Sequence, residues 1–524
     1  MSNSPAASQH RTIIHPHARH VIVVGIDGLR PDMINAATMP NLTAMRARGV
    51  SSKDHRTVFP SETRGALTAL ASGARPETTG VLGNEFYSRD GSGLLTGTDT
   101  IHDWRAGDKR LIGGMVTATN LSETLAKNGK SFAVVTSSGQ GSFTALNWKG
   151  GDWGQTGYNV RHPAVGFPPE LAVDIAEQHR VPANGLDRGA EKQAVAVFTD
   201  TVWPAKKPDA AIIWLTEVDS ASHRYGLGAE GMLASMRDCD IAIGNLLEWR
   251  DRQPEKDGIV IFVTSDHGHS TIVEFISVGD AFKEAGISAD TRLGDGVDVL
   301  YRRGRAPGFW LKKFDKGLLQ GVFDALAVQP WYGATFTPAI ERGSHEGILP
   351  GTLALELTGA AHPRAPDLYI NLKGDGTNNA FGVPGTSVCD AGSYSGIPLG
   401  GGSHGGLHST ELAAVLIGEG AGLKSGGQVI ASRTAIYDIA PTVLEMLGLK
   451  PAASMTGRPM FELFEEGEAV EAPVVTEFTA AIDGKVSRIV IGHVAGRAYI
   501  DEADLLTENA DKYGAQPKGA ELQS

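Results

Sequence analysis

Short runs of apolar and β-branched residues recur along the chain, each followed by a turn and then by a stretch of helical character. Such continuous apolar runs are typical of parallel strands that are buried on both faces. The predicted strands cover 21–28, 131–138, 210–219, 258–268 and 411–420, and the predicted helices cover 38–50, 63–72, 119–128, 190–203, 228–250 and 434–447. The alternation predicts an α/β fold with a mostly parallel sheet flanked by helices, whose ligands lie at the carboxyl ends of the strands.

Residues 271–399 break this rhythm with short mixed segments and stretches rich in glycine and proline. We interpret them as an inserted cap that shapes the substrate pocket. Two β-like runs flank an Asp-Gly pair at 483–484, which is typical of a hairpin turn, and a polar tail is predicted from 502 to 524. The predicted units are a catalytic α/β core of 1–270 and 400–465, the inserted cap of 271–399, and a C-terminal β-hairpin and tail of 466–524.

Composition is that of an ordinary globular protein, with 41% hydrophobic and 20% charged residues over 524 positions. The formal net charge of −13 argues against a stable nucleic-acid complex or contact with an anionic membrane, because both favour basic patches. The chain begins with polar residues and contains no run of about 18 apolar residues, so we expect a cytoplasmic protein without membrane contact. Cys239 and Cys389 are expected to be reduced thiols. An anionic small substrate would need local positive charge, such as metal ions.

Three of the apolar runs carry an aspartate at their carboxyl end: Asp27, Asp219 and Asp266. Parallel strands would bring these carboxylates to one edge of the sheet. Each aspartate alone has an ordinary explanation, because aspartate commonly caps a helix that follows a strand. The set gains weight from the histidines that accompany two of its members.

His223 follows Asp219 by four residues, so one helical turn could direct both side chains at one ion. His267 is adjacent to Asp266 at a strand end, and His404 lies in the glycine-rich segment GGGSHGGLHS. Mixed Asp/His ligand sets suit Zn²⁺ best, with Mn²⁺ or Fe as alternatives, whereas Ca²⁺ prefers oxygen ligands. These residues therefore predict a divalent metal centre.

The motifs resemble the type I phosphodiesterase and nucleotide pyrophosphatase family of the alkaline phosphatase superfamily. They recur in order as IDGLRPDM, MPNLTAMRARGV, TRGALTALASGARPETTGVLGNEFY, EVDSASHRYG, SDHG and GSHGG, followed by TAIYDIAPTVLEMLGL. The resemblance extends over 20–90, 210–270 and 400–460. It implies an alkaline-phosphatase-like fold with two divalent metal ions, one held by Asp219, His223 and His404 and the other by Asp27, Asp266 and His267.

Three further histidines receive structural interpretations first. The segment GSHEG around His345 copies GSHGG around His404, but the apolar run at 411–420 follows His404, as the superfamily arrangement requires. We therefore interpret His345 as a residue of a cap loop. His408 is a candidate for a hydrogen bond to one of the metal ligands. His269 is interpreted as a structural residue.

The resemblance also identifies a nucleophile, Thr63. In the family a threonine stands nine residues before the Thr/Ser-Gly pair that opens a short turn with a proline, and here that pair is Ser72-Gly73. Ser61 is a rival, and either hydroxyl could instead cap the helix that follows. A position at a helix N-terminus would favour a phosphoryl group, so capping and catalysis are compatible.

One position departs from the expected pattern. Three residues after Thr63, where an asparagine that donates to a phosphoryl oxygen is common in the family, this chain has Ala66. The candidate substrate-binding residues are Arg64, Asn84 and Tyr87. Each has an ordinary alternative: Arg64 could pair with surface acids, Asn84 could satisfy a turn, and Tyr87 could pack in the core as a buried aromatic residue.

By the resemblance, the reaction is hydrolysis of a phosphoric ester through a phosphothreonine intermediate. Relatives that cleave monoesters usually have Lys or Arg after the strand at 131–138, whereas here the first basic residue is Lys149. We therefore favour a phosphodiester or pyrophosphate substrate, and interpret RRGR (302–305) and LKK (311–313) as solvated surface. The alternatives are a phosphonate (phosphonoacetate-like) or phosphomonoester hydrolase on the same scaffold and, because of Ala66, a non-catalytic pseudoenzyme that binds a phosphorylated ligand.

Overall fold

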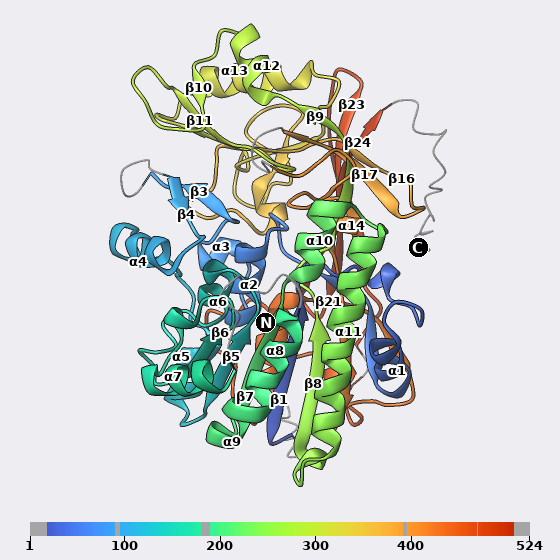
Figure 1. Cartoon of the computed structure of the whole chain (residues 1–524). Helices are drawn as coiled ribbons and strands as arrows, with labels where there is room; N and C mark the ends of the chain where they lie inside the picture. The colour runs from blue at the N-terminus through green and yellow to red at the C-terminus, as the bar shows by residue number, and fades with distance from the viewer. Residues whose placement is uncertain (1–17, 90–94, 180–188, 391–395, 469, 508–524) are drawn as a thin grey trace, which may run out of the picture.

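The computed structural model describes residues 18–89, 95–179, 189–390, 396–468 and 470–507. Within them, a nine-stranded mixed sheet of order β19-β2-β20-β8-β1-β7-β5-β6, with β21 paired to β2, forms the centre of the lower body in Figure 1. Its strands are β1 (His20–Ile26), β2 (Val50–Arg56), β5 (Phe132–Thr136), β6 (Thr156–Asn159), β7 (Ala210–Leu215), β8 (Ile259–Thr264), β19 (Ala413–Ala414), β20 (Leu416–Gly420) and β21 (Gln428–Ala435). The α/β fold class is confirmed.

The sheet is parallel on one side of β8 and mixed on the other, where β19 and β20 run antiparallel to β2 and β21 runs parallel to it. Strands β8, β1, β7 and β5 are parallel neighbours, as predicted, and β6, which was not predicted, continues the parallel set beside β5. The predicted strand at 411–420 was wrongly included in the parallel set, because β20 runs antiparallel to both β8 and β2. Apolar composition reveals burial but not strand direction.

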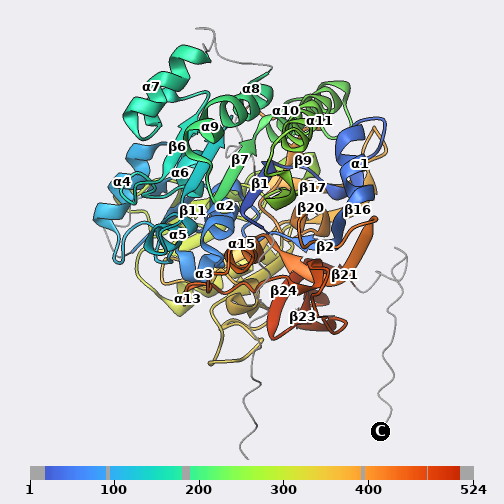
Figure 2. The ribbon, with the colours of Figure 1, turned by 90° about the horizontal axis from the view of Figure 1, so that it is seen from below.

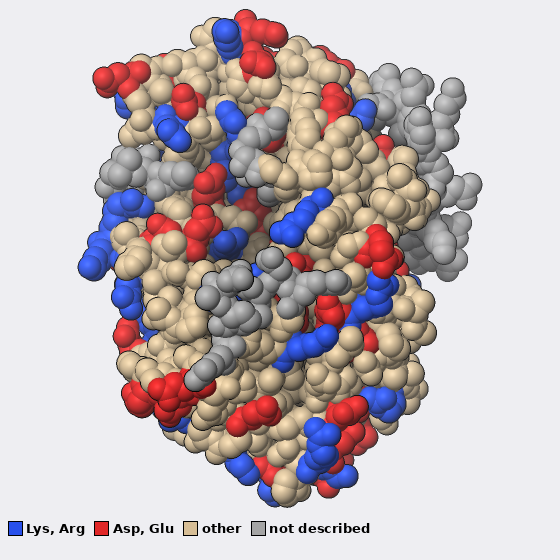
Figure 3. All heavy atoms as spheres, viewed as in Figure 1, with Lys and Arg blue, Asp and Glu red and all other residues tan. Residues whose placement is uncertain are grey.

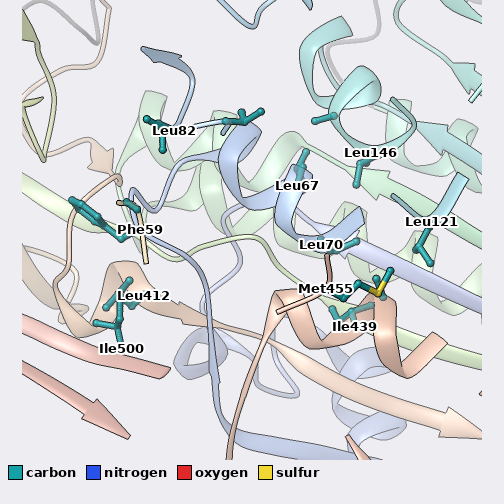
Figure 4. Close-up of a cluster of buried hydrophobic side chains, with 14 of the residues drawn as sticks. Phe59, Leu67, Leu70, Leu82, Leu121, Leu146, Leu412, Ile439, Met455 and Ile500 are labelled. Carbon is teal, nitrogen blue, oxygen red and sulfur yellow. The ribbon is translucent and has the colours of Figure 1, made fainter. Parts of the chain in front are cut away.

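Helices cover both faces of the sheet, which Figure 2 shows from below. Along β1, Ile22 and Val24 pack toward one face and Val21 and Val23 toward the other, as strand alternation requires. The first face is covered by α1 (Pro40–Arg48), α8 (Ala190–Val197) and α11 (Glu230–Asp251), and the second by α2 (Thr63–Ser72), α5 (Leu121–Lys127), α6 (Gln140–Leu146) and α15 (Ile439–Met446). Figure 4 shows part of the second layer, where Leu67 and Leu70 of α2 lie near Ile439 of α15. Each such buried aliphatic side chain contributes about 1.5–3 kcal/mol.

Residues 271–399, predicted as an inserted cap, contribute most of the two smaller sheets in the upper part of Figure 1. One has the order β10-β11-β12-β15-β13-β14 and packs with α12 (Val278–Glu284) and α13 (Lys316–Ala327) around a core of its own. The other has the order β16-β17-β9-β18, and here β18 (Gly402–Ser403) pairs with β9 (Ser270–Ile276). This pairing brings the segment before His404 next to the segment after His267. The remaining strands are β10 (Ala289–Asp290), β11 (Val299–Arg302), β12 (Gly308–Leu311), β13 (Ala334–Thr337), β14 (Leu353–Ala354), β15 (Leu368–Asn371), β16 (Gly374–Asn378) and β17 (Pro384–Asp390).

The C-terminal segment forms three strands rather than a hairpin with a tail. Strands β22 (Val474–Ile482) and β23 (Lys485–Val494) meet at the predicted Asp-Gly turn, and β24 (Arg497–Thr507) pairs with β23. The predicted start of the tail at 502 was therefore wrong, while 508–524 lie outside the described residues. Arg488 of β23 forms ion pairs with Glu502 and Asp504 of β24. Charged cross-strand pairs explain how so polar a segment can be a strand.

The surface and the cysteines agree with an ordinary globular composition. Acidic and basic side chains are interspersed on the face shown in Figure 3. Cys239 and Cys389 are buried free thiols. Among the described residues, no helix has both the length and the apolar character that a membrane span would need.

Candidate active site

The candidate ligands come from segments that follow adjacent strands of the main sheet. Asp27 follows β1, and Asp266 and His267 follow β8, its parallel neighbour. The strand predicted at 210–219 ends earlier, at Leu215, so Asp219 lies in the first turn of α10 (Glu217–Tyr225). On this helix Asp219 and His223 are one turn apart, and their nearest side-chain atoms are 3.3 Å apart. The carboxyl edge of the sheet thus gathers side chains from three strands, and His404 joins them from the loop after β18.

Four imidazole rings in this cluster present the same nitrogen to a backbone carbonyl. A carbonyl oxygen only accepts hydrogen bonds, so each Nδ1 carries the proton and each Nε2 carries a lone pair. This arrangement is the usual one for histidine metal ligands. The Nδ1–oxygen distances are 2.7 Å from His223 to Gly402, 3.1 Å from His267 to Gly268, 3.1 Å from His269 to Gly28 and 2.9 Å from His404 to Ser61.

The Nε2 atoms converge on carboxylate oxygens. The Nε2 atoms of His223, His269 and His404 lie 3.3, 3.0 and 3.6 Å from Asp219 Oδ1, respectively. His267 Nε2 lies 3.6 Å from Asp27 Oδ1 and 3.3 Å from Asp266 Oδ2. Lone pairs that face anionic oxygens repel one another unless a cation lies among them. The ligand atoms fall into two compact groups, Asp219 with His223, His269 and His404, and Asp27 with Asp219 and His267.

Two carboxylate oxygens in the cluster are buried without a donor. Asp27 Oδ2 accepts from Trp214 Nε1–H, and Asp266 Oδ1 accepts from the Gly28 and His267 N–H groups. Among the described residues, Asp27 Oδ1 and Asp266 Oδ2 have no hydrogen-bond donor. Burial raises the pKa of Asp266 to about 7 and, together with the Asp266 carboxylate, raises the pKa of Asp27. A cation would satisfy both orphaned oxygens, so the residues fit a metal.

Burial favours the neutral form of two of the histidines, His267 and His404. Burial lowers the pKa of His267 to about 3 and, together with His267, lowers the pKa of His404. Neutral imidazole is the form that binds metal. Burial disfavours the charged form of Asp219, but the adjacent histidines, His223 first, bring its pKa below the usual range. The donor chemistry therefore matches divalent Zn²⁺, Mn²⁺ or Fe.

All six predicted ligands are brought together, with two differences from the predicted sets. Asp266 lies beside His267 but outside the compact group that contains Asp27, and Asp219 belongs to both groups. His269, interpreted from sequence as structural, contacts Asp219 and belongs to one of the two compact groups, a placement that the sequence analysis did not predict. The spacing His267-Gly268-His269 was the available signal, because alternate residues of an extended segment point to the same side.

The other two histidines have ordinary surroundings. His408 is the N-cap of α14 (Ser409–Leu412), where its Nδ1 lies 2.8 Å from Thr410 Oγ1. His345 is exposed, and its ring lies 5.5 Å from that of Phe478. Neither residue belongs to the compact groups of ligand atoms.

Thr63 and Ser61 have different environments. Thr63 is the first residue of α2, and its Oγ1 lies 3.2 Å from His267 Nε2. Ser61 Oγ donates to the Gly406 carbonyl and accepts from the Gly405 N–H, while the Ser61 carbonyl accepts from His404 Nδ1. Ser61 therefore holds the loop that carries His404. The helix N-cap is Glu62, whose side chain makes no capping bond, so neither hydroxyl is a cap.

Asn84 lies at the start of the same helix. Its Oδ1 accepts from the Arg64 N–H at 3.1 Å, and its own N–H donates to Glu62 Oε2 at 2.6 Å. Ala66, by contrast, is fully buried in an apolar cluster with Ile436. An amide side chain at position 66 would enter that core. The departure at Ala66 therefore does not remove a donor from the site.

The other substrate-binding candidates have partners of their own. The Arg64 guanidinium pairs with the exposed Asp99 at 3.0 Å. Arg64 thus pairs with a surface acid, which was the alternative to a role in substrate binding. Tyr87 is 2% exposed, its hydroxyl donates to the Thr291 carbonyl, and its ring meets Trp310 edge to face at 5.1 Å. These contacts are those of a packing residue.

The basic segment at 302–305 is not solvated surface, as its sequence suggested. Arg302 and Arg305 are buried, and each is paired with a carboxylate: Arg302 Nη1 donates to both oxygens of Glu62 at 2.6 Å, and Arg305 Nε donates to Glu411 Oε1 at 3.0 Å. Sequence patterns describe charge but not its partners. The pair Arg302–Glu62 connects the cap to the residue before Thr63.

Replacing Arg302 by alanine should destabilise the protein by about 3–5 kcal/mol, because it leaves the Glu62 carboxylate buried without its partner. Urea unfolding would measure this loss, with the exposed Lys313→Ala as a control that should change little. The double variant Arg302→Met/Glu62→Gln should recover part of the stability. Equal effects of Arg302→Ala and Lys313→Ala would contradict the assignment.

A family profile described as "Type I phosphodiesterase / nucleotide pyrophosphatase" matches residues 21–377 of the chain. The chain belongs to this family. The matched segment of this phosphodiesterase family member includes the nucleophile candidate Thr63 and the candidate ligands up to His269. His404 lies beyond the match and is brought to the others by the tertiary structure.

Several curated proteins are similar to this phosphodiesterase family member. Venom phosphodiesterase CdcPDE of Crotalus durissus collilineatus is 23% identical over 261 residues, which is 48% of this chain and 26% of that protein. Ectonucleotide pyrophosphatase/phosphodiesterase family member 7 of Homo sapiens is 25% identical over 253 residues, 48% of each chain. Bis(5'-adenosyl)-triphosphatase enpp4 of Xenopus laevis is 24% identical over 253 residues, 47% of this chain and 46% of that protein. The matches thus cover half or less of these relatives.

Proposed function

We propose that this chain is a two-metal hydrolase that cleaves phosphodiester or pyrophosphate bonds through a phosphothreonine intermediate. The observation that carries the proposal is the position of Thr63. Its hydroxyl lies at the N-terminus of α2 and 3.2 Å from His267 Nε2, at the border of the Asp/His cluster. A hydroxyl with an ordinary pKa is a weak nucleophile until it is activated, and such a cluster is the means of activation.

Charge balance supports two metal ions rather than one. Three carboxylates, those of the buried Asp27 and Asp266 and the half-buried Asp219, outweigh one divalent cation but not two. We propose that Asp219, His223 and His404 hold one ion and that Asp27, Asp266 and His267 hold the other, with Zn²⁺ the favoured metal for this donor set. When bound, the ions would supply Lewis acidity toward the phosphoryl oxygens and lower the pKa of a coordinated hydroxyl.

The chain's own groups would carry the two displacements. Thr63 Oγ1 loses its proton and forms a bond to phosphorus as the bond to the leaving oxygen breaks, and water then hydrolyses the phosphothreonine and restores the hydroxyl. The first N–H groups of α2 and the helix dipole favour a phosphoryl group at this position. Asn84 Oδ1 accepts a hydrogen bond from the Arg64 N–H, which fixes the orientation of the side-chain amide. The amide nitrogen of Asn84 would then be the group that donates to a phosphoryl oxygen.

The arginines of the region favour a substrate of low charge. Arg64, Arg302 and Arg305 are each paired with a carboxylate, and Lys149 is paired with Asp108. A phosphodiester or pyrophosphate presents less charge at the reacting phosphorus than a monoester dianion does. The names of the relatives, phosphodiesterases and a bis(5'-adenosyl)-triphosphatase, agree with a small nucleotide-like substrate. The cytoplasmic location stays a prediction.

A substrate panel tests the proposal. Purified protein with Zn²⁺ is expected to hydrolyse a bis-aryl phosphodiester and a dinucleoside polyphosphate with a kcat/KM at least about tenfold above that for an aryl phosphomonoester, which corresponds to about 1.4 kcal/mol of transition-state stabilisation. EDTA should abolish the activity and added metal should restore it. A preference for the monoester or for a phosphonate would replace the proposal with the hydrolase alternative. Metal binding without turnover of any of these would favour the pseudoenzyme.

A further inference from the structure

His269 has no role in the proposed two-metal assignment, yet it is built into the cluster. Its side chain is fully buried, Nδ1 lies 3.1 Å from the Gly28 carbonyl oxygen, and Nε2 lies 3.0 Å from Asp219 Oδ1. Of the histidines around Asp219, His269 has its Nε2 closest to that oxygen. A residue with this placement requires an explanation beyond packing.

The backbone at Gly28 is shaped for this imidazole. Gly28 has a φ of +70°, a conformation that favours glycine, and a Cβ atom there would overlap His269 Cε1. The absence of a side chain lets the imidazole approach the Gly28 carbonyl. That contact keeps the proton on Nδ1 and directs the lone pair of Nε2 toward Asp219, as in the three other histidines.

A hydrogen bond alone does not account for the geometry. If Nε2 donated to Asp219, the neutral ring would present a lone pair from Nδ1 to the Gly28 carbonyl oxygen, and the two would repel. An imidazolium would satisfy both partners, but it would place a full positive charge on a side chain that is completely buried. With a cation between Nε2 and Asp219, the neutral ring donates from Nδ1 to the Gly28 carbonyl and directs its Nε2 lone pair to the cation, so that neither contact is repulsive.

We propose that His269 is a fourth protein ligand of the metal ion held by Asp219, His223 and His404. This inference rests on the metal binding of the proposed function but not on its substrate. Three imidazoles and a carboxylate would give this ion four protein ligands, whereas the group around Asp27 offers a single imidazole, that of His267. The chain would therefore hold two unequal ions, one tightly at Asp219 and one more weakly beside Thr63.

Metal-binding measurements test the inference without a substrate. Competition with a chromogenic chelator should resolve two Zn²⁺ dissociation constants for the wild-type protein, and His269→Ala should weaken the tighter one by roughly 100-fold, at or beyond the upper end of losses seen for supporting residues. The weaker constant should change far less. The Co²⁺-substituted protein should show an altered visible absorption spectrum in the variant, and added imidazole should restore both affinity and spectrum.

His55→Ala is the matched control. His55 is equally buried, on β2, and its Nδ1 contacts Thr434 Oγ1, so the variant opens a similar cavity without touching the cluster. Both Zn²⁺ dissociation constants should stay unchanged in His55→Ala.

Weaker binding in His269→Ala with an unchanged Co²⁺ spectrum and no rescue by imidazole would mean that His269 only positions Asp219, and would overturn the ligand role. Unchanged affinity would overturn it as well. Failure of the wild-type protein to bind metal would instead defeat the proposed function itself.

Discussion

Thr63→Ala is expected to lower kcat/KM for the preferred diester by roughly 10³- to 10⁶-fold, the range found when a nucleophile is removed. The physical reason is that Thr63 Oγ1 is the hydroxyl that borders the cluster, 3.2 Å from His267 Nε2. The substitution removes the atom that would bond to phosphorus but none of the candidate ligands. Metal analysis should therefore still find two ions per chain, and the variant should not form a covalent phosphoprotein.

Two further substitutions make the nucleophile test specific. Thr63→Ser keeps a hydroxyl at the helix start and should retain part of the activity and the phosphoprotein. Thr68→Ala, one turn further along α2, removes a buried hydroxyl that only donates to the Arg64 carbonyl, and it should leave turnover within a few-fold of the wild type. Nearly full activity in Thr63→Ala would move the nucleophile to Ser61 or to water. Ser61 is disfavoured because its hydroxyl already donates to Gly406 and accepts from Gly405.

His404→Ala should have the second large effect. Its imidazole stacks on that of His267 with ring centroids 3.7 Å apart, and its Nε2 lies 3.6 Å from Asp219 Oδ1. Loss of a ligand should weaken metal binding by more than about 100-fold, since even residues that only support ligands change it by 10- to 100-fold. Turnover should fall with metal occupancy. Equilibrium dialysis with metal analysis would measure the occupancy, and kcat would be followed at increasing Zn²⁺.

The chain contains a natural control for His404. His345 lies in GSHEG, a near copy of GSHGG, but its side chain is exposed beside Phe478. His345→Ala should leave metal content, turnover and thermal stability unchanged. Bound metal also stabilises the folded state, by about 4 kcal/mol for a site held at a thousand times its dissociation constant. The melting temperature should therefore rise with Zn²⁺ in His345→Ala and much less in His404→Ala, and equal behaviour of the two variants would refute the assignment.

Much of the fold follows from local patterns that the sequence contains. Buried apolar runs identify β1, β7 and β8, and the aspartates that follow β1 and β8 reach the same sheet edge because parallel strands share their direction. The four-residue spacing of Asp219 and His223 predicts a shared helix face, which α10 provides. The predicted helix at 63–72 coincides with α2, which begins at Thr63. Such inferences succeed because they depend on neighbours along the chain.

Other features depend on contacts between distant segments, and no local pattern encodes them. The antiparallel direction of β20 and the burial of Arg302 against Glu62 each require a partner far away in sequence. Ala66 illustrates the same limit, because its position in the core, rather than its missing amide, decides what it contributes.

The sequence by itself determined the strands, the helices and most of the residue types of the candidate site, because burial periodicity and short spacings are local properties. Only the tertiary structure decided which carbonyl each imidazole faces, and hence which nitrogen is directed at the carboxylates of the cluster. His269 belongs to this second class: its chemistry is set by Gly28 and Asp219, which lie 241 and 50 positions away in the sequence, respectively. Partners at such separations meet only when the sheet and α10 are assembled.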